Sequence, residues 1–178
     1  TFKEALEEVH QWSKTHPRHT PILITINTKE DVIDQPNFVQ PLPFDKQAFD
    51  NLDQEILSVF GISELIVPDY VRGNYQTLET AINADQWPTL KVSRGKIFFV
   101  LDADQEKIDI YKDGHPSLQG RILFVDAKEG QPEAAFRIIN DPLENRQYIQ
   151  DLVLKGYLVR TRADADTKEA RTGDTTRL

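Results

Sequence analysis

The chain has 178 residues, a hydrophobic fraction of 39%, a charged fraction of 28% and a net charge of −8 at pH 7. This length suffices for one ordinary domain with a sizeable core, and residues 1–178 are expected to form a single domain. The acidic balance argues against a general nucleic-acid binder, and no apolar run reaches the roughly 18 residues of a membrane span. The absence of cysteine excludes disulfides, thiolate nucleophiles and cysteine zinc sites.

The first half of the chain predicts a helix, a strand and further helices. Apolar residues recur at helical spacing over residues 2–14, and His16-Pro17 stops this helix. Residues 21–26 form a β-branched run typical of a strand covered on both faces. A polar connection with three prolines, residues 27–43, is expected to be an ordered loop. Asp45 is placed to cap a second helix that ends at Gly61, and a shorter helix is expected after Thr77.

The second half of the chain contains further predicted buried strands that end on polar residues. Residues 96–102 and 121–126 are predicted strands, each ending on an aspartate. Two helical pieces are expected at 133–138 and 143–155, with Gly156 in the left-handed position after the second. Residues 157–162 are predicted as the last strand, and Thr167 as the cap of a short terminal helix. This alternation predicts a parallel α/β fold.

Two α/β architectures compete, a doubly wound open sheet and part of a (β/α)8 barrel. A Rossmann site needs a glycine-rich turn after its first strand, and no glycine follows Ile26. In both architectures active residues lie at the C-terminal ends of strands. All four predicted strands end in polar groups, and four strands are half of a barrel; these groups are Asn27 and Lys29, Asp102, Asp126, and Arg160 with Arg162.

The two arginines of the last strand indicate an anion. Arg160 and Arg162 are two residues apart and therefore share a face of the strand. Arginine is costly to bury without an anionic partner, and its planar fork matches phosphate or carboxylate oxygens. A bound phosphate or carboxylate is one prediction. Ion pairing within the chain is the other, with Asp164, Asp166 or Glu169 as partner.

Several segments, in order and spacing, resemble the bacterial calcium-dependent phosphoinositide-specific phospholipases C, within the phospholipase C-like phosphodiesterases. No single one is as specific as a P-loop. The segments are His16-Pro-Arg-His19 before residues 21–26, Leu57-Ser-Val-Phe-Gly61, Trp87-Pro-Thr-Leu90, residues 94–102 and 116–124, Ala134-Ala-Phe136 with Asn140-Asp-Pro142, and Val159-Arg-Thr-Arg-Ala-Asp164.

The resemblance implies that the four strands are the fourth to seventh of a TIM barrel. The chain has no methionine and begins inside a helical pattern, so it is expected to be a piece of a longer protein rather than a processed mature one. The family's general base and general acid are histidines on early strands, which would precede Thr1. No catalytic residue is therefore expected here. The four histidines have unsuitable settings, on a helix, beside a proline turn or before a strand; they are His10, His16, His19 and His115.

The resemblance also implies calcium and a lipid substrate. Asn27 stands where related enzymes place an acidic calcium ligand; its amide oxygen can ligate calcium without adding charge, or can cap the following turn. The implied substrate is an inositol phospholipid or related glycerophosphodiester, in a secreted or periplasmic bacterial protein with peripheral membrane contact. Arg162, Arg160, Lys29 and Asp102 are the implied substrate-binding residues, each with solvation, capping or ion pairing as the alternative.

Two other functions are compatible with the sequence. One is a catalytically inactive binding or structural module on the same scaffold, which the neutral Asn27 favours slightly. The other is a free-standing α/β ligand-binding domain.

Overall fold

Two parallel sheets form the frame of this computed structural model, which describes residues 1–178. The first sheet has the order β1-β2-β3 and the second pairs β4 with β5, so the strand order follows the chain order. An isolated parallel bridge between Asp126 and Phe136 joins the end of β3 to the start of β4. The strands are β1 (Ile22–Asn27), β2 (Ile97–Asp102), β3 (Leu123–Val125), β4 (Phe136–Ile138) and β5 (Leu158–Arg160).

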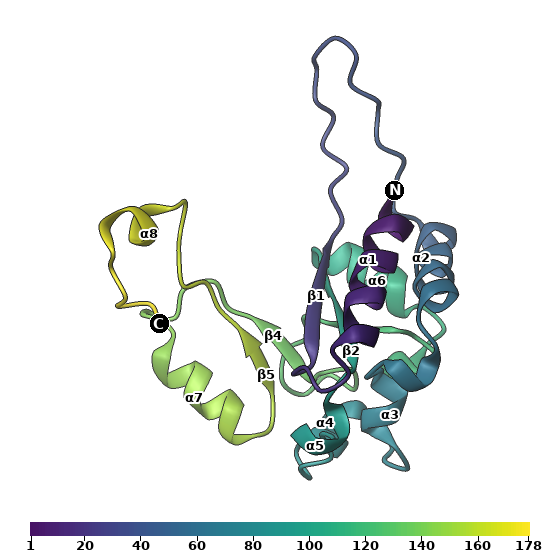
Figure 1. Cartoon of the computed structure of the whole chain (residues 1–178). Helices are drawn as coiled ribbons and strands as arrows, with labels where there is room; N and C mark the ends of the chain where they lie inside the picture. The colour runs from purple at the N-terminus through teal and green to yellow at the C-terminus, as the bar shows by residue number, and fades with distance from the viewer.

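Helices cover one face and one end of the first sheet (Figure 1). Helices α1, α2 and α6 lie along the face, α3 to α5 gather near the N-terminal ends of the strands, and α7 packs beside β5. The α-helices are α1 (Phe2–Thr15), α2 (Lys46–Val59), α3 (Pro68–Arg72), α4 (Leu78–Ile82), α5 (Leu90–Ser93), α6 (Gln105–Lys112), α7 (Arg146–Leu154) and α8 (Lys168–Thr172). The 3-10 helices are η1 (Ile62–Glu64) and η2 (Pro116–Leu118).

Local signals in the sequence account for several boundaries. The Asp45 carboxylate accepts from the amide of Ala48 at 2.8 Å and caps α2 as predicted. Gly156 follows α7 with φ +91°, and a Cβ there would lie 2.4 Å from the carbonyl oxygen of Ile82. Only glycine fits this position, because both the left-handed backbone and the close approach exclude a side chain. The Trp87 indole also donates to the Gly156 carbonyl at 2.7 Å.

The predicted helix over residues 133–138 is wrong. Residues 136–138 form β4, which pairs in parallel with β5, so the structure has five strands rather than four. The β-branched run around Ile138 and Ile139 prefers a strand, and pairing with β5 outweighs the helical spacing of the alanines before it. Helix α6 was missed within a stretch expected to be a connection, although Asp104 caps it. Thr167 precedes α8 as predicted, but its side chain makes no capping hydrogen bond.

The two faces of β2 meet different neighbours. The ring of Phe99 lies 6.0 Å from that of Phe60, at the end of α2, so Phe99 faces the helices. Phe98 points to the opposite face, where its ring lies 6.3 Å from that of Phe124. Because side chains alternate along a strand, Asp102 shares the face of Phe98, away from the helices.

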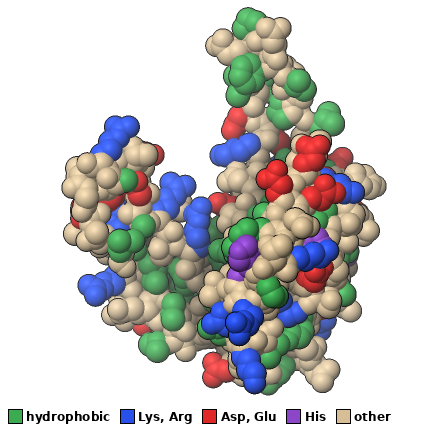
Figure 2. Space-filling model, in the orientation of Figure 1, with side chains coloured by type: hydrophobic (Ala, Val, Ile, Leu, Met, Phe, Trp, Pro, Cys, Tyr) green, Lys and Arg blue, Asp and Glu red, His purple; other side chains and the backbone are tan.

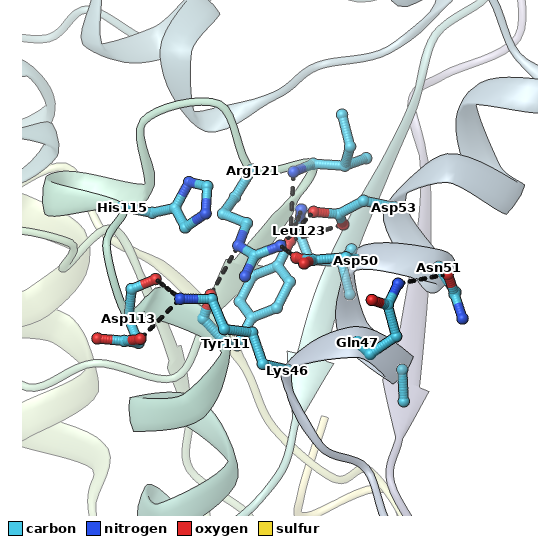
Figure 3. A network of polar contacts seen from close by, with 12 residues as sticks. Lys46, Gln47, Asp50, Asn51, Asp53, Tyr111, Asp113, His115, Arg121 and Leu123 are labelled. Carbon is cyan, nitrogen blue, oxygen red and sulfur yellow. Dashed lines mark hydrogen bonds and ion pairs between the residues drawn. The ribbon is translucent and has the colours of Figure 1, made fainter.

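A buried polar network ties the helices to β3 (Figure 3). Arg121 is 3% exposed; its Nη1 lies 2.6 Å from Oδ1 of Asp50 and 3.2 Å from Oδ2 of Asp53. The Tyr111 hydroxyl donates to Asp53 at 2.8 Å and accepts from the Leu123 amide at 2.9 Å. These contacts, here called the Arg121 network, join α2, α6 and β3. Burial raises the pKa of Asp53, outweighing the hydrogen bond from Tyr111 and the charge of Arg121.

Candidate functional site

Polar side chains gather where the parallel strands end. Asn27 and Asp102 are the last residues of β1 and β2, and they are direct register partners. Aligned residues of parallel strands project to the same face, so both side chains lie on the face opposite the helices. Asn27 is exposed and Asp102 is partly buried. The structure therefore brings the predicted metal-binding residue beside one predicted substrate-binding residue.

Arg160, the last residue of β5, links the two sheets at these ends. Its Nη1 donates to Oδ1 of Asn140 at 2.7 Å, and its Nη2 lies 3.5 Å from Oδ2 of Asp102. The side chains of Arg160 and Asp102 are each 26% exposed. The pair is loose and open to solvent, so the guanidinium keeps donors that an incoming anion can use.

A second arginine–aspartate pair, Arg137 and Asp126, lies between Asp102 and Arg160 in the chain. The Arg137 guanidinium donates to Oδ1 of Asp126, and the Ile138 amide donates to the same oxygen at 3.0 Å. Asp126 thus holds the backbone of β4, a structural role at a strand end. We call Asn27, Asp102, Asp126, Arg137, Asn140 and Arg160 the strand-end cluster.

Sequence reasoning missed Arg137 and Asn140 as members of this cluster. Both lay in or after a segment that was expected to be helical. A signal was present, because Phe136, Ile138 and Ile139 favour a strand and a polar Asn-Asp-Pro break follows them. A strand there would have placed Asn140 just beyond its C-terminal end.

Arg162 and Lys29 lie outside these contacts. Arg162 is exposed two residues beyond β5, and its carbonyl accepts from Nε of Arg177 at 3.1 Å. Glu169, one of its candidate structural partners, lies 3.5 Å from Nε of Arg177 instead. Lys29 is exposed in the segment that follows β1.

The four histidines contact local partners away from the strand-end cluster. His10 lies on α1, whereas His16 and His19 surround the turn that precedes β1. Their nearest polar partners are Glu64 Oε1 at 3.0 Å for His10, the Trp12 carbonyl at 2.9 Å for His16, the Thr20 carbonyl at 2.5 Å for His19 and the Gln119 carbonyl at 2.7 Å for His115. Helix capping and packing account for these settings.

The residues present do not make a complete calcium site. Calcium takes about six to eight oxygen ligands, several of them carboxylates. No group of three or more histidine, aspartate or glutamate side chains is arranged to hold a metal ion. Asn27 and Asp102 offer neighbouring oxygens, but Asp102 also faces the Arg160 guanidinium. These two residues alone do not fit a calcium ion.

No helix combines the length and apolar character that a membrane crossing needs. The surface is hollowed between the C-terminal part of the chain, which contains α7 and α8, and the loop that projects after β1 (Figure 2). Lysine and arginine side chains lie on the C-terminal side of this hollow.

Comparisons with known proteins agree with this architecture. The family model described as phosphoinositide phospholipase C, Ca2+-dependent, matches residues 1–178. The calcium-dependent phosphoinositol-specific phospholipase C from Pseudomonas sp. is similar in fold, with a TM-score of 0.67 and 16% identity over 97% of this chain. A phosphatidylinositol-specific phospholipase C from Streptomyces antibioticus gives a TM-score of 0.56 and 20% identity over 92% of this chain.

The chain spans 61% of the Pseudomonas chain and 51% of the Streptomyces chain. No curated protein matches the sequence significantly. The family match over the whole sequence decides the assignment. The chain belongs to the calcium-dependent phosphoinositide phospholipase C family.

Proposed function

We propose that the full-length protein is a phosphoric diester hydrolase of the phospholipase C type. Its substrate is an inositol phospholipid or a related glycerophosphodiester, and its setting is secreted or periplasmic. This chain supplies part of the barrel and part of the substrate pocket. The family assignment supports the reaction class, and one of the similar Pseudomonas structures is a myoinositol complex, which supports the inositol head group.

The five strands are proposed to be consecutive strands of a (β/α)8 barrel. Parallel strands in chain order support a barrel wall, because a doubly wound sheet reverses its order at a switch point. The resemblance gives Asn27 the fourth-strand position. Counted from there, the additional strand β4 extends the run from the fourth to the eighth position.

The contact between Arg160 and Asp102 carries the proposal. It lies at the C-terminal ends of the strands, where TIM-barrel active sites are built. Arg160 and Arg162 are proposed to bind phosphoryl oxygens, Asp102 to accept from inositol hydroxyls, and Lys29 to approach the negative charge from the loop side. Each role uses the donor or acceptor chemistry of the side chain.

The proton-transfer groups are proposed to lie outside residues 1–178. The family chemistry is attack of the inositol 2-hydroxyl on phosphorus, which needs a general base and a general acid. The local partners of the four histidines support the view that none of them has this role.

The test compares the full-length protein with residues 1–178 in a phosphatidylinositol hydrolysis assay with calcium and with a chelator. Full-length protein is expected to turn over only with calcium. Residues 1–178 are expected to lose about 10²–10⁴-fold for each missing acid or base group. Turnover by residues 1–178 that disappears when any one histidine is changed would overturn this division of roles.

A non-catalytic binding module is the second candidate. The carboxylates of Asp102 and Asp126 both face arginines, and the neutral Asn27 stands where the resemblance implies an acidic calcium ligand, which favours binding over catalysis. Full-length protein that binds an inositol phosphate in calorimetry but never releases product would establish this alternative.

A further inference from the structure

The guanidinium of Arg177 joins the two chain segments that leave β4 and β5. Its Nη2 donates to the carbonyl oxygen of Asn140 at 2.9 Å, and its Nε donates to the carbonyl oxygen of Arg162 at 3.1 Å. Asn140 lies two residues beyond the end of β4, and Arg162 lies two residues beyond the end of β5. A single side chain therefore holds both segments at the place where the strands end.

The chain after β5 leaves the sheet and then returns to it. It turns through α8 and comes back beside the N-terminal end of α7 (Figure 1). Asp166 and Thr167, just before α8, have φ angles of +58° and +64°. The left-handed region is unfavourable for residues other than glycine, so contacts elsewhere in the segment must hold this turn. The contacts of Arg177 provide them.

The charge of Arg177 is matched although its side chain is only 11% exposed. Its Nη1 lies 3.6 Å from Oδ2 of Asp141, and its Nε lies 3.5 Å from Oε1 of Glu169. Glu169 also accepts from the Ala165 amide at 2.8 Å, so the carboxylate is fixed in turn. A guanidinium can reach two carbonyls and two carboxylates together, because its five donors are fixed in one plane.

The same contacts set the position of Arg160. The side chain of Arg160 donates from Nη1 to Oδ1 of Asn140 at 2.7 Å, and its carbonyl accepts from the Ile139 amide at 2.9 Å. Arg177 thus holds the backbone of the residue that orients the Arg160 guanidinium. It holds the backbone of Arg162 directly.

We propose that Arg177 is a positioning residue for an anion at the strand-end cluster, because it fixes the segments beyond β4 and β5 that carry Arg160 and Arg162. This rests on the proposed function, which gives these two arginines a phosphoryl group as ligand. Two like charges repel one another while no anion lies between them. Holding both backbones reduces the entropy that is lost when the anion binds and keeps the donors aligned with its oxygens.

The direct test replaces Arg177 by lysine in the full-length protein. Lysine keeps the charge, but its ammonium cannot donate to the carbonyls of Asn140 and Arg162 together. Binding of myo-inositol 1-phosphate in calorimetry is expected to weaken about tenfold, which corresponds to one charge-assisted hydrogen bond. The matched control is Arg171→Lys, an exposed arginine on α8, which is expected to bind as wild type.

A double-mutant cycle distinguishes positioning from a general structural role. If Arg177 acts through Arg160, Arg177→Lys should weaken binding by less than about threefold when Arg160 is already lysine. A general structural role gives the same factor in both backgrounds and overturns the inference. Wild-type affinity of the Arg177→Lys variant overturns it as well, and so does an equal loss in the Arg171→Lys control.

Hydrogen exchange separates this inference from the proposed function. In Arg177→Lys, the amides of residues 139–144 and 160–164 are expected to exchange at least about tenfold faster than in wild type, whereas those of α1 keep their rates. Unchanged rates, or faster exchange throughout the chain, would contradict a local role. If wild type neither binds myo-inositol 1-phosphate nor hydrolyses phosphatidylinositol, the proposed function fails, while exchange still decides whether Arg177 fixes the two segments.

Discussion

Two arginines in this molecule meet aspartates in opposite ways. Arg121 is buried, its guanidinium binds Asp50, Asp53 and the Tyr111 carbonyl, and its CZ atom lies 4.5 Å from the Tyr111 ring centroid. Arg160 is partly exposed, and its contact with Asp102 is 3.5 Å long. The first arginine belongs to a network on the helix face of the sheet, and the second lies at the strand ends.

Burial and the length of the ion pair separate a structural arginine from one that can bind a ligand. A buried charge must be compensated by its own structure, because no water can do so. When a long ion pair of a partly exposed arginine opens, the folded protein loses little free energy, because water solvates both charges. An anionic ligand can therefore replace the carboxylate partner. The four predictions below test this contrast, starting with the largest expected effect on stability.

Arg121→Met is expected to cost about 3–5 kcal/mol of unfolding free energy, because it leaves Asp53 buried without its cation. Urea denaturation followed by circular dichroism measures the loss. Arg160→Met is the matched control and is expected to cost less than about 1 kcal/mol, since its ion pair is solvated. Equal losses for the two variants would remove the contrast.

Tyr111→Phe tests the hydroxyl within the Arg121 network. The hydroxyl donates to Asp53 and accepts from the backbone amide of Leu123, so its removal leaves buried groups unpaired. The expected cost is about 1–3 kcal/mol. Tyr148→Phe, on the exposed side of α7, serves as control and is expected to be neutral in the same denaturation assay. A neutral Tyr111→Phe would show that the network tolerates the gap.

The contrast between the arginines was not visible in the sequence. In the sequence, Arg121 is the first residue of a predicted strand. No neighbouring residue indicates that Asp50 and Asp53, about seventy positions earlier, are its partners. Such partners are chosen by tertiary packing of α2 against α6. The parallel α/β class, the Asp45 cap and the Gly156 turn follow from local residues, and the structure confirms them.

The candidate site was predictable only where it depends on the order of the strands. Polar residues that end neighbouring parallel strands meet at one edge of the sheet, and Asn27 and Asp102, each predicted at the end of a strand, are register partners there. The strand β4 is only three residues long, too short for periodicity to decide, and its pairing with β5 is a long-range event. The roles of Arg160, Arg162 and Lys29 toward a ligand stay predictions.

The pH dependence of stability should differ between the buried and exposed carboxylates. Burial raises the pKa of Asp53 in the folded protein, so its contribution is fully present below the unfolded pKa of about 4 and is lost as pH rises through the folded pKa. The hydrogen bond from Lys46 lowers the pKa of Asp113. The contribution of Asp113 to stability is therefore present above its unfolded pKa and is lost as pH falls through its folded pKa.

Denaturation of wild type and Asp53→Asn across pH 3 to 8 checks this sign. Wild type is expected to lose stability relative to Asp53→Asn as pH rises, whereas it should gain relative to Asp113→Asn. Parallel curves for wild type and Asp53→Asn would mean that Arg121 fully compensates the buried charge.

The smallest stability effect and the sharpest functional one are expected for Arg160→Lys and Arg162→Lys in the full-length protein. Lysine keeps the charge but loses the planar fork that binds two phosphoryl oxygens. Hydrolysis of phosphatidylinositol should fall about tenfold to a hundredfold, corresponding to one charge-assisted hydrogen bond. The unfolding free energy should change by less than about 1 kcal/mol, because both side chains are solvated. If stability falls instead and the folded fraction keeps its activity, the two arginines are structural, as Arg121 is, and the strand-end cluster is not a phosphate site.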